Sequence, residues 1–310
     1  MSKIAIVIPT IREESFKRFI VSWSDLFKKH DVKLVVVRDG KKPEVTEYDY
    51  KQNILDPFGM TGDYVFGKTK AANEVMSEYK DIIYNFNDGV RNLGFAYVAR
   101  YLPEVEYIIS FDDDVAPPVG ADPIFDHINV LNRKTPITWL STAGHYTRGF
   151  PYGIREEAEV VLSHGVWQGV ADWDAPTQLV FGNRQTSFYK GVIPKGTLFP
   201  LCAMNFAFKR KLLPYIYQAP MGPKVGLDRF ADIWAGIEAK KDIDKLNWAV
   251  VSGFSTINHL RASNVYTNLI KEAKGLSMNE EYGKDPYFDL FFKKRKRWGE
   301  FITKYECKKV

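Results

Sequence analysis

The chain has 310 residues, enough for one large or two small domains with a sizeable core. A hydrophobic content of 45% and a charged content of 26% are ordinary for a globular protein and place it outside the disordered and fibrous classes. The net charge of +5 fits an anionic small ligand such as a nucleotide and does not require nucleic acid as a partner.

Two features favour a cytoplasmic setting. Cys202 and Cys307 are the two cysteines and provide no disulfide framework, which favours a reducing compartment. The N-terminus leads straight into a strand-like segment, without the long apolar region of a signal peptide, and no apolar run is long enough to span a bilayer. We therefore expect a cytoplasmic protein without an integral membrane segment. Peripheral association with a membrane surface is left open.

The first half alternates strand-like and helix-like segments, which indicates a Rossmann-related α/β sheet flanked by helices. Residues 3–8 and 33–38 are apolar runs typical of strands covered on both faces, and residues 13–29 between them have helical spacing. Parallel strands need such a crossover helix. The next expected elements are an irregular stretch at 41–62, a helix at 68–80, a strand at 82–86, a helix up to Tyr101 with Asp88 as N-cap, a strand at 107–111, a helix at 122–131 and a strand at 137–141.

The second half is richer in aromatic residues, glycine and proline, and its segments at 145–155, 163–168 and 172–178 are expected to be site-building loops. We expect helices at 209–217 and from about 228, and a strand at 248–252. The basic and aromatic segment at 291–298 is interpreted as the solvated face of a C-terminal helix, in preference to a surface for RNA or an anionic membrane. We expect a single domain with three parts: a nucleotide-binding half (1–120), a sugar or acceptor half (121–275) and a basic helical tail (276–310).

Three consecutive carboxylates, Asp112 to Asp114, follow the strand expected at 107–111. Adjacent acids repel one another and cannot be buried unless something neutralises them. A divalent cation does this and accepts substrate phosphates as further ligands. The triplet alone does not decide between such a site and a solvated acidic turn. Its position favours a metal–diphosphate site, because open α/β sheets bind ligands beyond the carboxyl ends of their strands.

Other charged and polar side chains end neighbouring strands and should converge on the same edge of the sheet. They are Thr10, Arg12, Asp39, Asp88 and Arg91. Each alone could belong to a turn or to the surface, but together they indicate a nucleotide site. Arg148 and Arg155 flank an aromatic loop, where a guanidinium fork suits phosphate and an ordinary surface pair is the alternative. His259 is the best candidate metal ligand among five histidines, although a lone histidine is more often structural.

The ordered set of motifs resembles the reversibly glycosylated polypeptides, also called UDP-arabinopyranose mutases, a family best known from plants. The resemblance runs from Ile8 to about Leu269. Its motifs are Ile-Pro-Thr-Ile-Arg at 8–12, Asp88 with Arg91, the triplet at 112–114, Arg-Gly-Phe-Pro at 148–151 with Arg155, Asp-Trp-Asp-Ala-Pro-Thr-Gln-Leu at 172–179, Pro-Lys-Gly-Thr-Leu-Phe-Pro at 194–200, Asp-Ile-Trp-Ala-Gly at 232–236 and Ala-Ser-Asn at 262–264.

The resemblance implies a GT-A-like fold, a UDP-sugar ligand and a divalent metal, manganese first and magnesium as the alternative. It implies interconversion of UDP-L-arabinopyranose and UDP-L-arabinofuranose, with reversible glycosylation of Arg148 and a need for Arg155. The residues then take the following roles: Asp112, Asp114 and His259 as metal ligands; Thr10, Arg12, Asp39, Asp88, Arg91 and Asp113 around the nucleotide; Asp172 and Trp234 around the sugar; and Arg148, Arg155, Asp174 and Asp232 in catalysis.

A guanidinium stays protonated at neutral pH and is a poor nucleophile, so we expect Arg148 or Arg155 mainly to stabilise the departing diphosphate. Two other functions remain open from the sequence. One is a metal-dependent UDP-sugar glycosyltransferase that uses a separate acceptor. The other is a non-catalytic UDP-sugar-binding partner subunit, because Ala231 stands where the plant pattern has an aspartate. A homo-oligomer is also left open.

Overall fold

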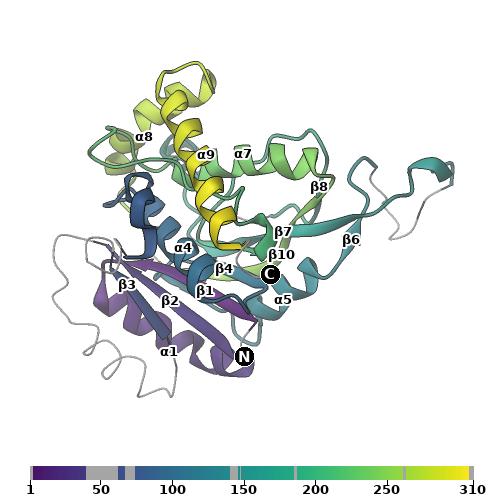
Figure 1. Ribbon diagram of the computed structural model, residues 1–310, viewed down its shortest axis with the longest axis horizontal. Helices are drawn as coiled ribbons and strands as arrows, with labels where there is room; N and C mark the ends of the chain where they lie inside the picture. The colour runs from purple at the N-terminus through teal and green to yellow at the C-terminus, as the bar shows by residue number, and fades with distance from the viewer. Residues whose placement is uncertain are drawn as a thin grey trace.

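The computed structural model describes residues 3–39, 62–66, 74–139, 146, 148–184, 187–260 and 263–306. A mixed β-sheet with helices on both faces forms its centre (Figure 1). One side of the sheet is parallel, in the order β3-β2-β1-β4. These strands are β1 (Ile4–Thr10), β2 (Val32–Arg38), β3 (Gly62–Phe66) and β4 (Tyr107–Phe111). The predicted α/β class with a Rossmann-related parallel half is confirmed.

Beyond β4 the sheet becomes mixed. Next to β4 lies β9 (Asn205–Lys209), antiparallel to it, followed by β7 (Ala158–Gly169), antiparallel to β9. The strand β10 (Ala249–His259) is parallel to β7 and pairs antiparallel with both β5 (Val115–Ala116) and β8 (Gly191–Ile193). The short strand β6 (Lys134–Thr135) is antiparallel to β7. His259 pairs with Val115, so the last strand returns to the acid triplet. A parallel half that carries the acidic turn, followed by a mixed extension, is the GT-A-like arrangement that was predicted.

Alternate residues of the strands feed two cores, one on each face of the sheet, as the two-residue period of a strand requires. Helices α1 (Glu13–Lys29) and α5 (Pro123–Leu131) cover one face; α4 (Arg91–Tyr101), α7 (Ala231–Lys245) and α9 (Tyr287–Glu306) cover the other. The close approach of α4 to the sheet requires Gly94, since a Cβ there would come 2.4 Å from Cγ1 of Val7 and 2.8 Å from Cγ2 of Val37.

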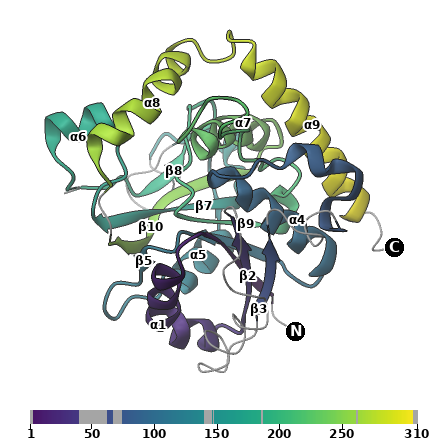
Figure 2. The same ribbon diagram turned by 90° about the vertical axis from the view of Figure 1, so that its left-hand side faces the viewer.

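Two helices lie beside each other above the mixed half of the sheet. They are α6 (Ala175–Phe181) and α8 (Val265–Glu280), and Figure 2 shows them side by side. Each begins with a side-chain cap: Asp174 accepts a hydrogen bond from the backbone N of Thr177, and Asn264 accepts one from Thr267. Short 3-10 helices occupy Ser77–Ile82, Asp88–Val90, Tyr152–Ile154 and Arg210–Leu212.

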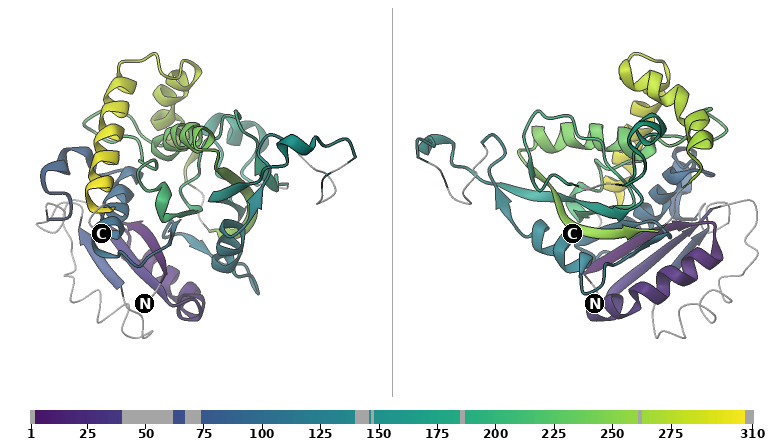
Figure 3. Two further views of the ribbon diagram at one scale, coloured as in Figure 1. Left: turned by 45° about the vertical axis from the view of Figure 1, so that its right-hand side comes forward. Right: turned by 180° about the vertical axis from the view of Figure 1, so that it is seen from behind.

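Between β6 and β7 the chain projects from the body of the protein (Figure 3). We call the described residues 136–139, 146 and 148–157 the arm. Arg155 is held within it: its Cζ lies 3.7 Å from the centroid of the Tyr152 ring and 4.9 Å from that of Tyr146, and its NH2 group donates to the carbonyl of Phe150. Tyr152 itself is 84% exposed. The arm therefore has its own small aromatic–arginine cluster.

Most of the expected elements are confirmed, including the helix at 122–131, which Asp122 caps by accepting from the backbone N of Phe125. The helix expected from about 228 begins at Ala231, and the strand expected at 248–252 continues to His259. The Asp88 cap is wrong: Asn87 accepts the hydrogen bond from the backbone N of Gly89. Of the helix expected at 68–80, the described residues 74–80 are helical, and residues 41–61 lie outside the described part of the chain.

Four other expectations are wrong. Residues 82–86 contain no strand: Ile82 is buried at the end of the 3-10 helix Ser77–Ile82, and its carbonyl accepts from the Tyr217 hydroxyl (2.6 Å). The third parallel strand is β3 instead. No strand occupies the described residues 137–139, and 209–217 forms a strand end followed by the 3-10 helix Arg210–Leu212 in place of an α-helix. Residues 163–168 belong to β7 and not to a loop.

The C-terminal tail is the predicted helix. α9 buries one aromatic face, and its Trp298 donates from Nε1 to the carbonyl of Leu213. Its basic residues pair with acids of the body, for example Lys294 and Arg297 with Asp81. Lys293 and Lys296 of the same segment are exposed, as expected of the solvated face of a structural helix. No helix in the described residues is long and apolar enough to cross a membrane.

Candidate functional site

A cleft of about 680 Å³ opens beyond the carboxyl ends of β1 and β4, at the end of β10. This volume lies in the range typical of small-ligand sites. Eight of the residues predicted for the site line the cleft: Arg12, Asp88, Asp112, Asp114, Asp172, Asp174, Asp232 and His259. Thr10, Arg91 and Asp113 stand directly behind this lining: Thr10 and Asp113 bond to Arg12, and Arg91 bonds to Asp112. The predicted convergence at one edge of the sheet is therefore what the structure has.

One side of the cleft, which we call the strand wall, consists of Arg12, Arg91 and the triplet Asp112 to Asp114. The Thr10 hydroxyl donates to Oδ2 of Asp113 at 2.6 Å, and NH2 of Arg12 bonds to both Asp113 and Asp114. Asp113 is almost fully buried and points away from the cleft opening. Burial raises the pKa of Asp113 although Thr10 and Arg12 oppose the shift.

The pKa shifts of Arg12 and Asp113 point in opposite directions on whether their pairing is favourable. The charges and hydrogen bonds of Asp113 and Asp114 outweigh burial and raise the pKa of Arg12, which indicates a favourable pairing. The raised pKa of Asp113 indicates that burial costs its charged form more than the pairing returns. A guanidinium stays protonated across the accessible pH range, so only Asp113 can change its protonation state. The raised pKa of Asp113 is therefore the better guide to the balance between burial and pairing. The pair is therefore a compensated burial of charge and not a strong net attraction.

Arg91 fixes the first acid of the triplet. Its NH2 donates to Oδ1 of Asp112 at 2.7 Å, and its NH1 donates to the Ser110 hydroxyl (2.5 Å) and to the carbonyl of Ala203 (3.0 Å). The side chain is 1% exposed, in the first turn of α4. A fully buried guanidinium with this many partners holds Asp112 at one position at the floor of the cleft.

The residues predicted to bind a divalent metal, Asp112, Asp114 and His259, all line this cleft. Nδ1 of His259 donates to the carbonyl of Val170 at 2.9 Å, which leaves its Nε2 as the ring nitrogen able to bind a metal. Burial and the charge of Asp112 raise the pKa of Asp114, and the charges of Arg12 and His259 oppose them. No three acidic, histidine or cysteine side chains of the described residues form a ready metal-binding group. Carboxylate oxygens and a neutral imidazole nitrogen are ligands that manganese and magnesium accept, so the metal site stays a prediction.

The opposite side, which we call the helix wall, consists of Asp172, Cys202 and Asp232. Oδ2 of Asp232, in the first turn of α7, accepts from the backbone N of Ala203 at 2.8 Å. The Cys202 thiol lies 2.9 Å from Oδ2 of Asp172; burial, then the charges of Asp172 and Asp232, raise its pKa, so it stays protonated and donates.

The acids of the cleft raise one another's pKa. Burial, then the charges of Asp172 and Asp88, raise the pKa of Asp232 to about 7. Burial deep in the cleft, then the charge of Asp112, raise the pKa of Asp88 to about 6. The Asp88 side chain is exposed and Asp232 is half-buried, so water in the cleft screens Asp88 more strongly than Asp232. Asp232 is a carboxyl that both protonates and ionises near neutral pH.

Two predicted site residues have structural roles instead. Trp234 is fully buried, packs on Phe230 and Phe288, and donates from Nε1 to Asn279, so the structure does not bring it to the cleft lining and its contact with the sugar stays a prediction. Asp174 lines the cleft, but both of its oxygens accept hydrogen bonds from Thr177, from the backbone N and from the hydroxyl. It caps α6, and this occupies the groups that catalysis would use.

Three further predictions lie outside the cleft lining. Asp39 is buried at the end of β2 and accepts from the backbone N of Phe86. Arg148 and Arg155 lie on the arm, where Arg148 is exposed and Arg155 is stacked on aromatic rings. The structure does not bring these two arginines together with the acid triplet.

Sequence reasoning missed a second charged group in the cleft. Arg229, Lys271 and Glu272 line it, and Nε of Arg229 donates to Oε1 of Glu272 at 2.6 Å. Arg229 has φ +68°, a left-handed conformation that costs a non-glycine residue about 1–3 kcal/mol. The sequence signal that could have pointed to Arg229 as a cleft residue is its position three residues before Asp232. Nothing in the sequence shows the backbone conformation or the pairing with a residue 43 positions later.

Comparison with known proteins gives a consistent assignment. A family model described as reversibly glycosylated polypeptide matches residues 1–296. UDP-arabinopyranose mutase 3 of Arabidopsis thaliana is 34% identical over 294 residues, which cover 89% of this chain and 75% of that protein. UDP-arabinopyranose mutase 1 of Oryza sativa subsp. japonica is 33% identical over 292 residues, with 89% and 75% covered.

Among solved structures, the mannosyltransferase PcManGT from Pyrobaculum calidifontis, in complex with GDP-Man and Mn2+, aligns over 98% of this chain and 73% of that chain. The two are 12% identical with a TM-score of 0.44, and at this distance the likeness says nothing about chemistry. The family assignment rests on the sequence matches alone. By these matches the chain belongs to the reversibly glycosylated polypeptide family.

Proposed function

We propose that this protein is a metal-dependent UDP-sugar mutase that interconverts UDP-L-arabinopyranose and UDP-L-arabinofuranose. Its relatives carry the name UDP-arabinopyranose mutase. The observation that carries the proposal is the cleft itself, in which an acid triplet at the end of a central strand faces a protonatable acid across a space of small-ligand size. The first side suits a metal–diphosphate and the second suits a sugar.

On the strand wall, Asp112 and Asp114 would hold the divalent cation, with His259 as a third ligand. When bound, that ion would neutralise the diphosphate and favour its departure from the anomeric carbon. Arg91 fixes the position of Asp112, and Arg12 and Thr10 fix Asp113 behind it. The chain thereby prepares the acids before the nucleotide arrives.

On the helix wall, Asp232 can serve the change of ring size. The oxygen that leaves the sugar ring gains a proton, and the hydroxyl that enters it loses one. A carboxyl whose pKa is about 7 gives and takes protons in the neutral range. Asp172, held by the Cys202 thiol, lies beside it and can accept hydrogen bonds from sugar hydroxyls.

One observation favours a second candidate, a glycosyltransferase with a separate acceptor. The arm keeps Arg148 away from the cleft lining, so no arginine acceptor of the arm faces the nucleotide site. Under this alternative an external hydroxyl would take the sugar. Reversible glycosylation of Arg148, and a homo-oligomeric state that could bring an arm to another cleft, stay predictions.

The deciding experiment is proton NMR of the purified chain with manganese chloride and UDP-L-arabinopyranose. The mutase predicts that the furanose isomer appears until equilibrium is reached, without accumulation of free UDP. A transferase predicts free UDP only when an acceptor is added. UDP binding without either product would leave a non-catalytic binding subunit. Chelation of the metal with EDTA should abolish the isomerisation, and added manganese should restore it.

A further inference from the structure

Arg229 is a charged residue of the cleft that the roles above do not use. It lies just before α7, in a left-handed backbone conformation with φ +68°, and it reaches the cleft lining. Strained residues of this kind persist where the surrounding structure holds them, and they gather at functional sites. The side chain is therefore held in place at some energetic cost.

Glu272 of α8 holds it. The residue is 3% exposed, its Oε1 accepts from Nε of Arg229 at 2.6 Å, and its Oε2 accepts from the backbone N of Ala175 at 2.7 Å. Both carboxylate oxygens are thus committed, one to the guanidinium and one to the start of α6. Glu272 fixes the direction of the Arg229 side chain relative to two helices.

This pairing leaves the fork of the guanidinium available. Glu272 engages Nε, and within the described part of the chain the two terminal nitrogens of Arg229 have no hydrogen-bond partner. The side chain is 29% exposed, toward the cleft. Two N–H groups at the end of a planar fork bind phosphate oxygens in pairs.

The other cations in and behind the cleft lining each pair with an acid. Arg12 and Arg91 bond to the acid triplet, and Lys271 lies 3.2 Å from Asp228. The charges of Asp172 and Asp88 act on Arg229 across the cleft, without a hydrogen bond between them among the described residues. In the described part of the chain Arg229 is hydrogen-bonded to one carboxylate, through Nε, so both of its terminal nitrogens are available to an incoming anion.

We propose that Arg229, oriented by Glu272, binds the diphosphate of the nucleotide sugar and stabilises the charge that develops on it. The inference rests on the proposed function and gives to Arg229 the role expected of Arg148 or Arg155. In the step concerned the bond from the anomeric carbon to the phosphate oxygen breaks, and its electron pair stays on that oxygen. The same oxygen re-forms the bond to the isomerised sugar. Arg229 keeps its protons throughout.

The first test measures binding, which does not depend on turnover. Calorimetry with UDP and with uridine, both in manganese chloride, compares the parent chain with Arg229→Met. UDP affinity should fall about tenfold, the loss of one charge-assisted contact, while uridine affinity stays within about twofold. Equal UDP affinity in variant and parent would overturn the proposal. A parent chain that binds no UDP would overturn this inference and the proposed function together.

The second test measures turnover. In Arg229→Met the turnover number should fall about 100-fold, and added guanidinium ion should recover part of it, which a purely structural defect would not allow. A parent chain that binds UDP without isomerising the sugar would refute the mutase function and leave the binding test of Arg229 in force.

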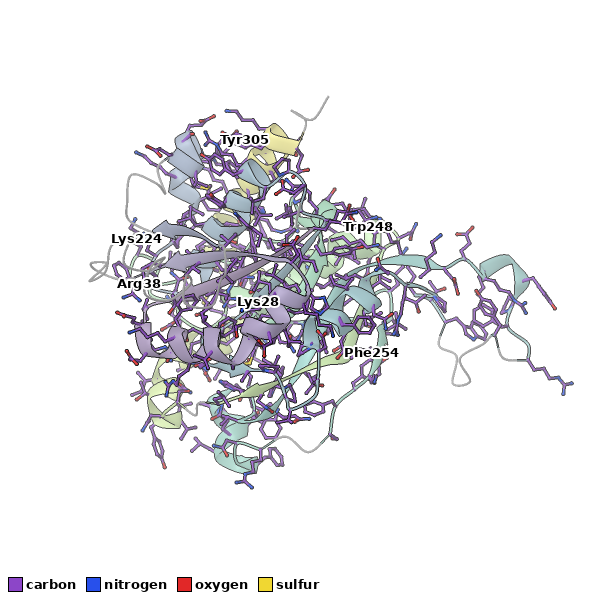
Figure 4. All side chains as sticks on the ribbon, turned by 90° about the horizontal axis from the view of Figure 1, so that it is seen from below. Lys28, Arg38, Lys224, Trp248, Phe254 and Tyr305 are labelled. Atoms are coloured by element: carbon purple, nitrogen blue, oxygen red, sulfur yellow. The ribbon has the colours of Figure 1, made fainter. Side chains whose placement is uncertain are left out.

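Control variants separate charge from fold. Arg133→Met serves as the matched control, because Arg133 is exposed, lies outside the cleft lining and packs over Phe254, labelled in Figure 4. If Arg229→Met does not fold, Arg229→Lys and Glu272→Gln decide. Both should lower the ratio of UDP to uridine affinity, and an unchanged ratio in both would overturn the proposal.

Discussion

The two walls of the cleft treat their carboxylates differently. On the strand wall every acid of the triplet bonds to a guanidinium, Arg91 for Asp112 and Arg12 for the other two. On the helix wall Asp172 bonds to a thiol and Asp232 to a backbone N–H. A permanent cation opposes protonation, whereas a neutral donor leaves it possible. Burial raises the pKa of Asp113 and Asp114 on the strand wall too, but guanidinium groups oppose the shift there, so we expect charge to be held more firmly on that wall and protons to exchange more readily at Asp232.

The largest expected effect comes from the strand wall. Arg91→Met would leave Asp112, the Ser110 hydroxyl and the Ala203 carbonyl without their buried donor. Breaking one partner of a buried pair is costly, so the free energy of unfolding in urea at pH 7 should fall by about 3–5 kcal/mol. Arg133→Met, at an exposed position, should change it by less than about 0.5 kcal/mol. A loss below about 1 kcal/mol for Arg91→Met would show that the pairing is not what holds this wall.

The next effect comes from the helix wall and depends on pH. The pKa of Asp232 is about 7 in the folded protein, against 3.8 for an ordinary aspartate, so the folded state holds a proton that the unfolded chain has released. The protonated Asp232 carboxyl therefore contributes fully to the free energy of unfolding below about pH 4, and this contribution is lost as the pH rises through 7. Asp232→Asn cannot ionise and should escape that loss.

Urea unfolding at pH 4.5 and 7.5 checks this. The stability of Asp232→Asn relative to the parent should improve by about 1–3 kcal/mol between the two values, since one pKa unit corresponds to about 1.4 kcal/mol and water in the cleft reduces the full shift. Isomerisation should be lost in the same variant, because an amide exchanges no proton. Parallel pH profiles for variant and parent would mean that Asp232 is ionised throughout.

A smaller effect is expected at Arg12, whose side chain is 34% exposed. Arg12→Met leaves the buried Asp113 with the Thr10 hydroxyl but no cation. Burial already raises the pKa of Asp113, and losing Arg12 raises it further, so the cost grows as the pH rises. We expect the free energy of unfolding to fall by about 1–2 kcal/mol at pH 7 and by less at pH 5. A cost that is larger at pH 5 would contradict this account.

The contrast between the walls also separates what the sequence could predict from what it could not. The strand wall follows from local patterns, because short apolar runs end in polar residues and parallel strands align those ends. Thr10, Arg12 and the acid triplet therefore came together as expected. The helix wall depends on pairings across long sequence separations. Glu272 reaches Arg229 and Ala175, and Trp234 packs into the core although its neighbour Asp232 faces the cleft.

Contacts between residues far apart in sequence also explain the elements that were predicted wrongly. Ile82 and its neighbours have the β-branched and aromatic character of a strand, but the core buries Ile82, whose carbonyl accepts from the Tyr217 hydroxyl, without strand pairing. Residues 163–168 carry a glycine and a histidine that suggested a loop. They form the centre of β7, where Ser163 bonds to His127 and His164 to Ser252. Buried partners far away in sequence satisfied polar groups that would otherwise require solvent.

The smallest effect is expected outside both walls, on the arm. Arg148 is exposed there, so Arg148→Ala should change the free energy of unfolding by less than about 0.5 kcal/mol. It should also leave UDP affinity unchanged, since the residue is absent from the cleft lining, whereas Arg229→Met should weaken UDP. Calorimetry on the two variants side by side makes the comparison direct. A tenfold loss of UDP affinity in Arg148→Ala would instead mean that an arm reaches a cleft in solution and that Arg148, and not Arg229 alone, supplies positive charge to the diphosphate.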